Sequence, residues 1–201
     1  MRSVVEPLPA AWHDEGVEDP ALIGALRSGD RRAFAVLVQH ETRAVYQATY
    51  RILGRTADAE DVTQEAFVAA YRSIGTFRAE GSLRGWLLRI ATRIAFRRLS
   101  QRRETADLAA VGEPVLADRS AEPARAVIAA ERQQTVRDAI EELPDPYREV
   151  VALRFLADLS LAEVAEATGR PLNTVKTHLR RGLERLRPRL APEVETRMSD
   201  R

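Results

Sequence analysis

The chain has 201 residues, of which 45% are hydrophobic and 30% charged, enough for one large or two small globular domains without cross-links. It contains no cysteine, which excludes disulfide frameworks, thiolate metal sites and a cysteine nucleophile. No apolar run approaches the roughly 20 residues that span a bilayer. We therefore expect a cytoplasmic protein without membrane insertion.

The formal net charge of +1 conceals two basic blocks that alternate with acidic segments. Residues 27–103 hold 15 basic and 7 acidic side chains, and residues 170–190 hold 7 basic and 1 acidic. All basic residues except Lys176 are arginine, which codon composition alone can explain, so only their clustering is informative. Two basic faces on a nearly neutral chain favour contact with polyanions.

The predicted elements are helical throughout, which indicates an all-α protein. Residues 1–24 carry acids and prolines without a periodic apolar face, and we expect a disordered acidic extension there. Apolar residues spaced by three and four then predict three amphipathic helices. Their apolar positions are Phe34, Leu37, Val38 and Val45 in the first, Val62, Phe67, Ala70, Tyr71 and Ile74 in the second, and Leu83, Leu87, Ile90, Ala91 and Ile94 in the third.

An acidic cluster lies at the start of the second of these helices. Acids at a helix start complement its dipole, and capping alone would be the plainest interpretation. The polar surface continues for another turn, however, and such a surface in a basic domain suits a protein partner better than nucleic acid. The cluster consists of Asp58, Glu60, Asp61, Gln64 and Glu65.

The third helix carries a stripe of arginines about one turn apart and follows a loop that contains Phe77 and Gly81. A basic stripe after an aromatic-bearing loop can hold a nucleic-acid backbone and capture an exposed base. Phe77 and Trp86 are alternatively core residues, and for Trp86 we favour the core. The stripe consists of Arg89, Arg93, Arg97 and Arg98.

Residues 104–125 contain two prolines, a glycine and an acidic excess, which predicts a linker. A second helical block follows over residues 126–190, and residues 191–201 form a C-terminal tail. The first helix of the block at residues 126–190 should end before Pro144, because the residue before proline avoids the helical region. We expect Asp145 to cap the next helix, with Pro146 at its first position.

A helix-turn-helix pattern follows within this second block. Ser160 and Glu163 have the spacing of a capping box, and Gly169 can adopt the left-handed conformation that ends a helix. Asn173 is the expected cap of the next helix. Its predicted apolar stripe is Leu172, Val175, Leu179, Leu183 and Leu186, and its opposite face carries Lys176, Arg180, Arg181, Arg185 and Arg187.

Such a motif places the amino-terminal residues of its second helix in the major groove of DNA. A solvated basic helix with ordinary caps is the alternative, which the coincidence of capping box, turn and basic face makes less favoured. The histidines at positions 13, 40 and 178 have no metal-ligand spacing, so we expect no metal and no cofactor. Candidates for base or phosphate contact are Asn173, Thr174, Lys176, Thr177, His178 and Arg180, with Arg181 and Arg185 closer to the DNA backbone.

Three strings in this order resemble the extracytoplasmic-function (ECF) sigma factors, the small two-domain group of the sigma-70 family. They are DAEDVTQEAF, then FR…G…WL…IA, then AEVAEATGRPLNTVKTHLRRG. The resemblance covers roughly residues 25–103, as region 2, and 126–190, as region 4. It implies two small helical domains joined by a flexible linker, and a transcription initiation factor without catalytic chemistry.

The resemblance also implies partners and site residues. The acidic cluster would dock on the coiled coil of the largest subunit of bacterial core RNA polymerase. Promoter DNA would be read twice, the −35 element by the helix-turn-helix candidates above and the melted −10 element by region 2. An anti-sigma factor is a further implied partner. The −10 contacts would be Arg78, Glu80, Ser82, Leu83, Arg84, Arg89, Arg93 and Arg97.

The chain departs from the family pattern at Arg93, Arg97, Ser100, Thr177 and His178, so we predict no promoter sequence. An autonomous helix-turn-helix regulator is the alternative function, but it would leave the acidic cluster and the arginine stripe unused. No nucleophile–base pair, metal cluster or phosphate-binding glycine loop in the sequence supports an enzyme.

Overall fold

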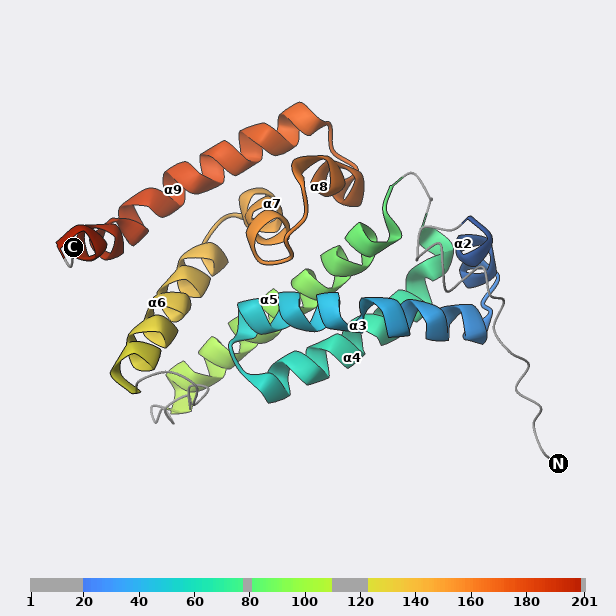
Figure 1. Cartoon of the computed structure of the whole chain (residues 1–201), viewed down its shortest axis with the longest axis horizontal. Coiled ribbons are helices and arrows are strands. Elements are labelled where there is room, and N and C mark those ends of the chain that lie inside the picture. The colour runs from blue at the N-terminus through green and yellow to red at the C-terminus, as the bar shows by residue number, and fades with distance from the viewer. Residues whose placement is uncertain (1–19, 78–80, 110–122, 200–201) are drawn as a thin grey trace.

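The computed structural model describes residues 20–77, 81–109 and 123–199, with side chains described over 20–77, 81–102 and 131–190. These residues form two helical bundles in contact with each other, and the prediction of an all-α fold is confirmed (Figure 1). The N-terminal bundle contains α2 (Pro20–Arg27), α3 (Arg31–Leu53), α4 (Thr56–Ser73), the 3-10 helix η1 (Ile74–Thr76) and α5 (Leu83–Ala109). The C-terminal bundle contains α6 (Pro123–Glu141), α7 (Asp145–Phe155), α8 (Leu161–Thr168) and α9 (Leu172–Ser199).

The three long helices α3, α4 and α5 pack on one another and form the core of the N-terminal bundle. The Asp30 carboxylate accepts the Arg32 backbone N–H at 2.7 Å and caps α3, which ends at Gly54 in the left-handed conformation, with φ of 72°. Most predicted apolar positions lie in this core. Tyr71 differs, since it is 43% exposed and packs edge-on against Phe34.

Helix α2 begins inside the segment that we expected to be disordered. Its Leu22 and Leu26 are buried in the core, so the expected boundary after residue 24 is wrong. An eight-residue helix has too few turns for its apolar face to be distinguished from the acidic, proline-containing sequence before it. Residues 1–19 lie outside the described residues.

The expected linker is shorter than residues 104–125. Helix α5 continues to Ala109 and α6 begins at Pro123, so helix covers both ends of that segment, while 110–122 lie outside the described residues. Residues 104–109 contain no glycine or proline, and their composition tolerates a helix that continues past its apolar face.

The helix-turn-helix is present as α8, a turn and α9. The capping box is confirmed: the Ser160 hydroxyl accepts the Glu163 backbone N–H at 3.2 Å, and the Glu163 carboxylate accepts the Ser160 N–H at 2.7 Å. The left-handed C-cap at Gly169 is also confirmed, with φ of 66°.

Two predicted helix caps are wrong by one or two residues. Helix α7 already includes Asp145, which pairs with Arg148 rather than capping the backbone. Helix α9 already includes Asn173, because the Pro171 carbonyl accepts the Thr174 N–H at 2.8 Å. In both cases the carbonyl of the preceding proline accepts the first backbone hydrogen bonds of the helix, so the proline and not the polar residue after it takes the N-cap position.

Only part of the predicted apolar stripe of α9 is buried. Val175 and Leu186 are buried, whereas Leu172 and Leu183 are 40% and 42% exposed. For Leu183 the reason is its neighbour Gly182, which faces α7 so closely that an added Cβ would lie 2.8 Å from Val151 Cγ2. The two helices cross at a glycine, and Leu183 points away from the crossing.

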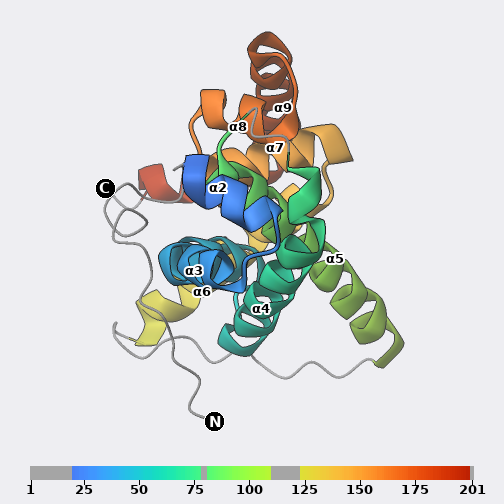
Figure 2. The same cartoon turned by 90° about the vertical axis from the view of Figure 1, so that its right-hand side faces the viewer.

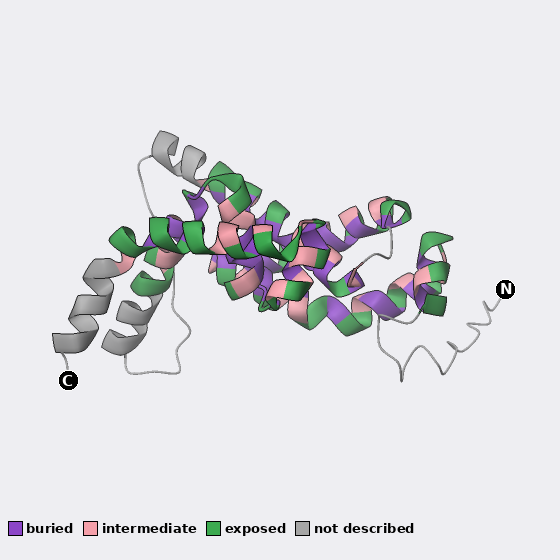
Figure 3. Cartoon of the chain, turned by 90° about the horizontal axis from the view of Figure 1, so that it is seen from above, coloured by how far each residue is buried: buried purple, intermediate pink, exposed green. Residues whose placement is uncertain are grey.

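The two bundles are joined mainly through α5, which packs against both α7 and α8, and α3 also contacts α6. Viewed end-on, α7, α8 and the first turns of α9 lie above α3 and α4, whereas α6 extends down beside α3 (Figure 2). Buried residues run through the middle of the molecule from one bundle into the other and form one core cluster (Figure 3).

Candidate protein and nucleic-acid interfaces

The predicted acidic cluster lies on α4, and its members differ in exposure and in ion pairing. Glu60, Asp61 and Gln64 are exposed. Among the described residues, no ion pair involves Glu60 or Asp61. These three side chains therefore form a polar surface that can accept a basic partner; we call them the α4 acidic face.

The other two acids of the cluster hold α4 against α5. Asp58 pairs with Arg102 at 3.2 Å and with Arg55 at 3.8 Å. The second acid, Glu65, contacts two successive arginines of α5, Arg97 at 2.9 Å and Arg98 at 3.3 Å. Both carboxylates are partly buried, so their first role is to join these two helices.

The predicted arginine stripe on α5 is not a single continuous surface. Arg97 turns toward Glu65 on α4, whereas Arg89 turns toward the C-terminal bundle, where its Nε donates to Glu149 at 2.7 Å. Arg93 is exposed between them. Arg84 at the start of α5 pairs with the largely buried Glu41 of α3 at 3.6 Å.

The candidates around the loop before α5 separate into core and surface residues. Leu83 is fully buried, so its predicted contact with DNA is wrong: it begins the same helical face as Leu87, which packs into the core. The hydroxyl of Ser82 accepts the Gly85 N–H at 3.2 Å and so caps α5. Arg78 and Glu80 lie outside the described residues.

Both aromatic residues near this loop belong to the core. Phe77 is 5% exposed, and Trp86 is half-buried and packs against the core cluster. Their ring centroids are 5.5 Å apart. The interpretation of Trp86 as a core residue is therefore confirmed.

The basic face predicted for α9 is present and exposed. Thr174 and Thr177 are half-buried, and the Thr177 hydroxyl donates to the Asn173 carbonyl at 2.9 Å within the helix. Arg180 pairs with Glu184 one turn later at 2.6 Å, an exposed pair that binding can easily replace. The exposed residues of this face of α9 are Asn173, Lys176, Arg180, Arg181, Arg185 and Arg187.

His178 differs from its neighbours on α9. Its ring packs edge-on against Tyr147 of α7 at 5.6 Å, and its Nδ1 has no hydrogen-bond partner among the described residues. Desolvation, followed by the nearby Arg170 and Arg181, lowers the pKa of His178. A neutral ring turned toward α7 is a poor phosphate contact, so this candidate fits the DNA face less well.

Arg137 is a structural residue that the sequence pattern gave no reason to single out. The residue is 8% exposed, and its guanidinium donates from Nε to the Arg51 carbonyl of α3 at 2.9 Å and lies against Gly54. Desolvation lowers the pKa of Arg137. One arginine among 30 has no distinguishing neighbour in the sequence, so only the tertiary fold reveals that it joins α6 to α3.

Family models match both bundles. Sigma-70 region 2 matches residues 37–105, and a sigma-70 region 4 model matches residues 133–186. The chain is 36% identical over 177 residues to the ECF RNA polymerase sigma factor SigW of Bacillus subtilis, covering 84% of this chain and 94% of that protein. It is 30% identical over 188 residues to the ECF sigma-E factor of Escherichia coli K12, covering 90% and 98%.

Solved structures agree with these relatives. CnrH, solved in complex with the cytosolic domain of CnrY, superposes with a TM-score of 0.58 at 25% identity, covering 87% of this chain and 98% of CnrH. The chain belongs to the ECF group of the sigma-70 family. It is a sigma factor that directs RNA polymerase to promoters, and sigma factors are transcription initiation factors rather than known enzymes. None of the described helices is long and apolar enough to cross a membrane.

Proposed function

We propose that this sigma factor uses three separate surfaces: the α4 acidic face for core polymerase, the start of α5 for the −10 element, and α9 for the −35 element. The observation that carries this assignment is the separation of charge. Glu60 and Asp61 are adjacent exposed acids on α4, whereas exposed bases line α9. One surface suits a basic protein and the other suits a polyanion, so they can be occupied together.

The −35 assignment depends on the geometry of α8 and α9. The capping box and Gly169 fix the short helix and the turn, so the first two turns of α9 lie beside α8 at the edge of the bundle and present one face to the outside (Figure 1). Asn173 and Lys176 are exposed there and can reach base edges, while Arg181 and Arg185 lie further along and suit phosphates. An autonomous regulator would need the same helix, but it would not need the α4 acidic face.

The −10 assignment is carried by Ser82, Arg84, Arg89 and Arg93 at the start of α5. Arg93 is exposed, and the pairs of Arg84 and Arg89 with carboxylates can be exchanged for pairs with phosphates. Arg97 contributes after it leaves Glu65, an exchange that is easy because more than half of its side chain is exposed.

We also propose an anti-sigma partner and a cytoplasmic location. CnrH was solved with the cytosolic domain of CnrY, and the sigma factor RpoE of Bartonella quintana was solved with the anti-sigma factor NepR. Two bundles with an intervening connection offer surfaces for a protein of this class. The polymerase and promoter DNA that this chain would engage are cytoplasmic.

The deciding experiment is equilibrium binding of the full chain to sigma-free bacterial core polymerase without DNA. We expect saturable one-to-one binding, which Asp61→Arg together with Glu60→Arg should weaken, because both acids are exposed and reversal of charge introduces repulsion. The matched control is Glu131→Arg, an exposed acid on α6.

Helix content should be unchanged in all three proteins, because none of these side chains is buried. Equal binding by the double variant and the wild type would remove the acidic-face assignment. Failure of the folded wild-type chain to bind core polymerase, combined with specific affinity for duplex DNA, would instead favour the autonomous regulator.

A further inference from the structure

Arg137 of α6 carries a charge that is buried without a carboxylate beside it. The residue is 8% exposed, and among the described residues its hydrogen bonds go to neutral oxygen atoms. Its Nε donates to the Arg51 carbonyl at 2.9 Å, and its Nη atoms reach the side-chain oxygens of Gln134 and Gln133 at 3.5 and 3.3 Å. A buried guanidinium is ordinarily paired with an anion, because burial removes its hydration.

The end of α3 balances only part of the charge on Arg137. The Arg51 carbonyl lies in the last turn of α3, where carbonyls lack partners within the helix and carry a partial negative charge. A helix end amounts to about half an elementary charge, so a positive remainder stays on the guanidinium. Desolvation, the largest influence, lowers the pKa of Arg137, so the surroundings favour the charged form less than water does.

Arg137 lines a cavity of about 320 Å³ between the end of α3, α6 and the end of α7. Tyr50, Val136 and Leu156 supply apolar walls. The ring of Tyr50 stacks on that of Tyr46, with centroids 6.0 Å apart. Cavities of this size, mostly apolar and with a few polar groups that fix orientation, are typical of small-molecule sites.

A second arginine, Arg51, lines the same cavity. It is exposed, and its Nη1 donates to the Leu156 carbonyl at 3.0 Å. In the part of the chain that the structure describes, Arg51 forms no ion pair and no acidic side chain lines the cavity. Two guanidiniums therefore lie beside an apolar surface without a counter-ion. We call the cavity formed by Tyr50, Arg51, Val136, Arg137 and Leu156 the α6 cavity.

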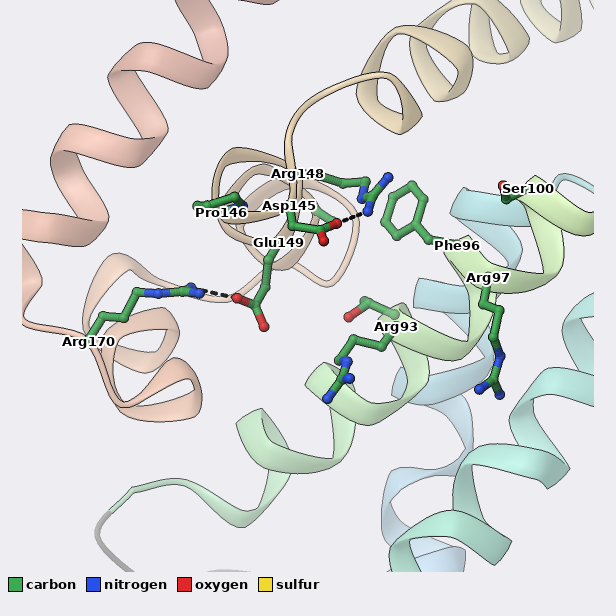
Figure 4. A pocket seen from close by; sticks show the side chains of 11 residues that line it. Arg93, Phe96, Arg97, Ser100, Asp145, Pro146, Arg148, Glu149 and Arg170 are labelled. Atoms are coloured by element: carbon green, nitrogen blue, oxygen red, sulfur yellow. Dashed lines mark hydrogen bonds and ion pairs between the residues drawn. The ribbon is translucent and has the colours of Figure 1, made fainter.

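A larger cavity between α5 and α7, of about 440 Å³, differs in its charge balance. The arginines that reach it from the C-terminal bundle have carboxylate partners (Figure 4). Arg148 pairs with Asp145, and Arg170 pairs with Glu149. Arginines that line a cavity do not by themselves indicate an anion site, and the missing counter-ion distinguishes the α6 cavity.

We propose that the α6 cavity binds a small molecule with an oxyanion head group on an apolar body, such as an aliphatic carboxylate or phosphate monoester. Arg137 and Arg51 hold the head group through charge-assisted hydrogen bonds, and the body lies on the apolar walls. Because the walls come from both bundles, the bound molecule joins α3 to α6 and stabilises the complete chain. The site shares no residue with the surfaces proposed for polymerase and promoter.

Titration calorimetry of the full chain with octanoate and with octyl phosphate tests the proposal. We expect saturable one-to-one binding of at least one of these anions and a higher melting temperature at saturation. The tighter of the two identifies the head group. Octanamide has a similar body without the charge, and acetate has the charge without the body, so each should bind at least about tenfold more weakly. No binding of either anion, or equal affinity for octanamide, would overturn the proposal.

Arg51→Gln removes one contact to the head group and keeps the backbone carbonyl that Arg137 needs. Because this side chain is exposed, the variant should retain its helix content, and its affinity for the anion should fall by at least about tenfold. Arg43→Gln, an exposed arginine earlier on α3, is the matched control and should bind like the wild type. Unchanged affinity in Arg51→Gln, or an equal fall in both variants, would contradict the site.

Methyl NMR spectra locate the bound anion without altering Arg137, which the fold needs to join α6 to α3. Signals of Val136 and Leu156 should shift as the anion is added, whereas those of Leu179 and Leu183 on α9 should not. Shifts confined to α9 would mean that the anion binds the basic face of that helix, and would overturn the assignment to the α6 cavity.

Discussion

Single residues at the start of α5 divide into those that maintain the bundle and those that face outward. Leu83 was expected to contact DNA by the resemblance, yet its side chain is fully buried. Ser82 caps the helix, and Arg84 lies outside the core. A family motif marks the position of a segment in the fold, but adjacent residues of a helix point in directions about 100° apart.

Leu83→Ala should therefore reduce stability rather than alter promoter choice. Truncating a fully buried leucine costs about 2–5 kcal/mol, through lost burial and the cavity left behind. Chemical denaturation followed by circular dichroism would measure this change. An unchanged midpoint, together with altered transcription from different promoters, would return Leu83 to the DNA-contact group.

The surroundings of Glu149 determine the direction in which its pKa is shifted. Burial alone would raise the pKa of Glu149, but hydrogen bonds and charges from Arg89 and Arg170 together hold it below the ordinary value of 4.5. Because the pKa of Glu149 is lowered in the folded chain, its carboxylate contributes fully to the free energy of unfolding at pH values above the ordinary pKa. This contribution is lost as the pH falls through the lowered pKa of the folded chain.

A comparison of the wild type with Glu149→Gln checks this sign. The difference between their free energies of unfolding should be constant from neutral pH down to about pH 5.5 and should shrink below about pH 4. Urea titrations at several pH values would measure it, with Glu131→Gln as the exposed control. A difference that grows on acidification would contradict the assigned pKa direction.

At the scale of the helices, much could be predicted from sequence because local signals agreed. The capping box at Ser160, the glycine at 169 and the periodic apolar positions each fix local geometry, and the structure contains all three features. The crossing of α7 and α9 at Gly182 could not be predicted, because it depends on where Val151 lies in three dimensions. The sequence pattern therefore assigned Leu183 to a buried face that it does not occupy.

The first turns of α9 should carry the base-specific part of promoter binding. Lys176→Ala should lower transcription from a responsive promoter and reduce discrimination among −35 sequences, at a cost of about 1–3 kcal/mol for a base contact. Arg132→Ala, an exposed arginine on α6, is the matched control. Equal transcription from all templates by Lys176→Ala and the wild type would exclude this role.

At the scale of the whole molecule, the relation between the bundles was not accessible from the sequence. Arg89 and Glu149 are 60 residues apart, and charged residues make up 30% of the chain, so no pattern pairs these two. The same holds for Arg137 of α6 and the Arg51 carbonyl of α3. The packing of complete helices determines which residues form long-range pairs of this kind.

A continuous core across both bundles predicts cooperative unfolding. In a Trp12→Phe background, fluorescence of Trp86 would report on the N-terminal bundle, while circular dichroism reports on all helices. The two denaturation curves should coincide, as expected for a two-state transition. Separate midpoints would mean that the bundles unfold independently.

Arg89 contacts the C-terminal bundle and also belongs to the proposed DNA surface, and this double use has an evolutionary consequence. A substitution at Arg89 would change promoter binding and the packing of α5 on α7 and α8 at once. Drift at Glu149, by contrast, would weaken the contacts with Arg89 and Arg170 without removing either arginine. Selection could therefore adjust how firmly the two bundles are held together through α7 while Arg89 remains available to DNA.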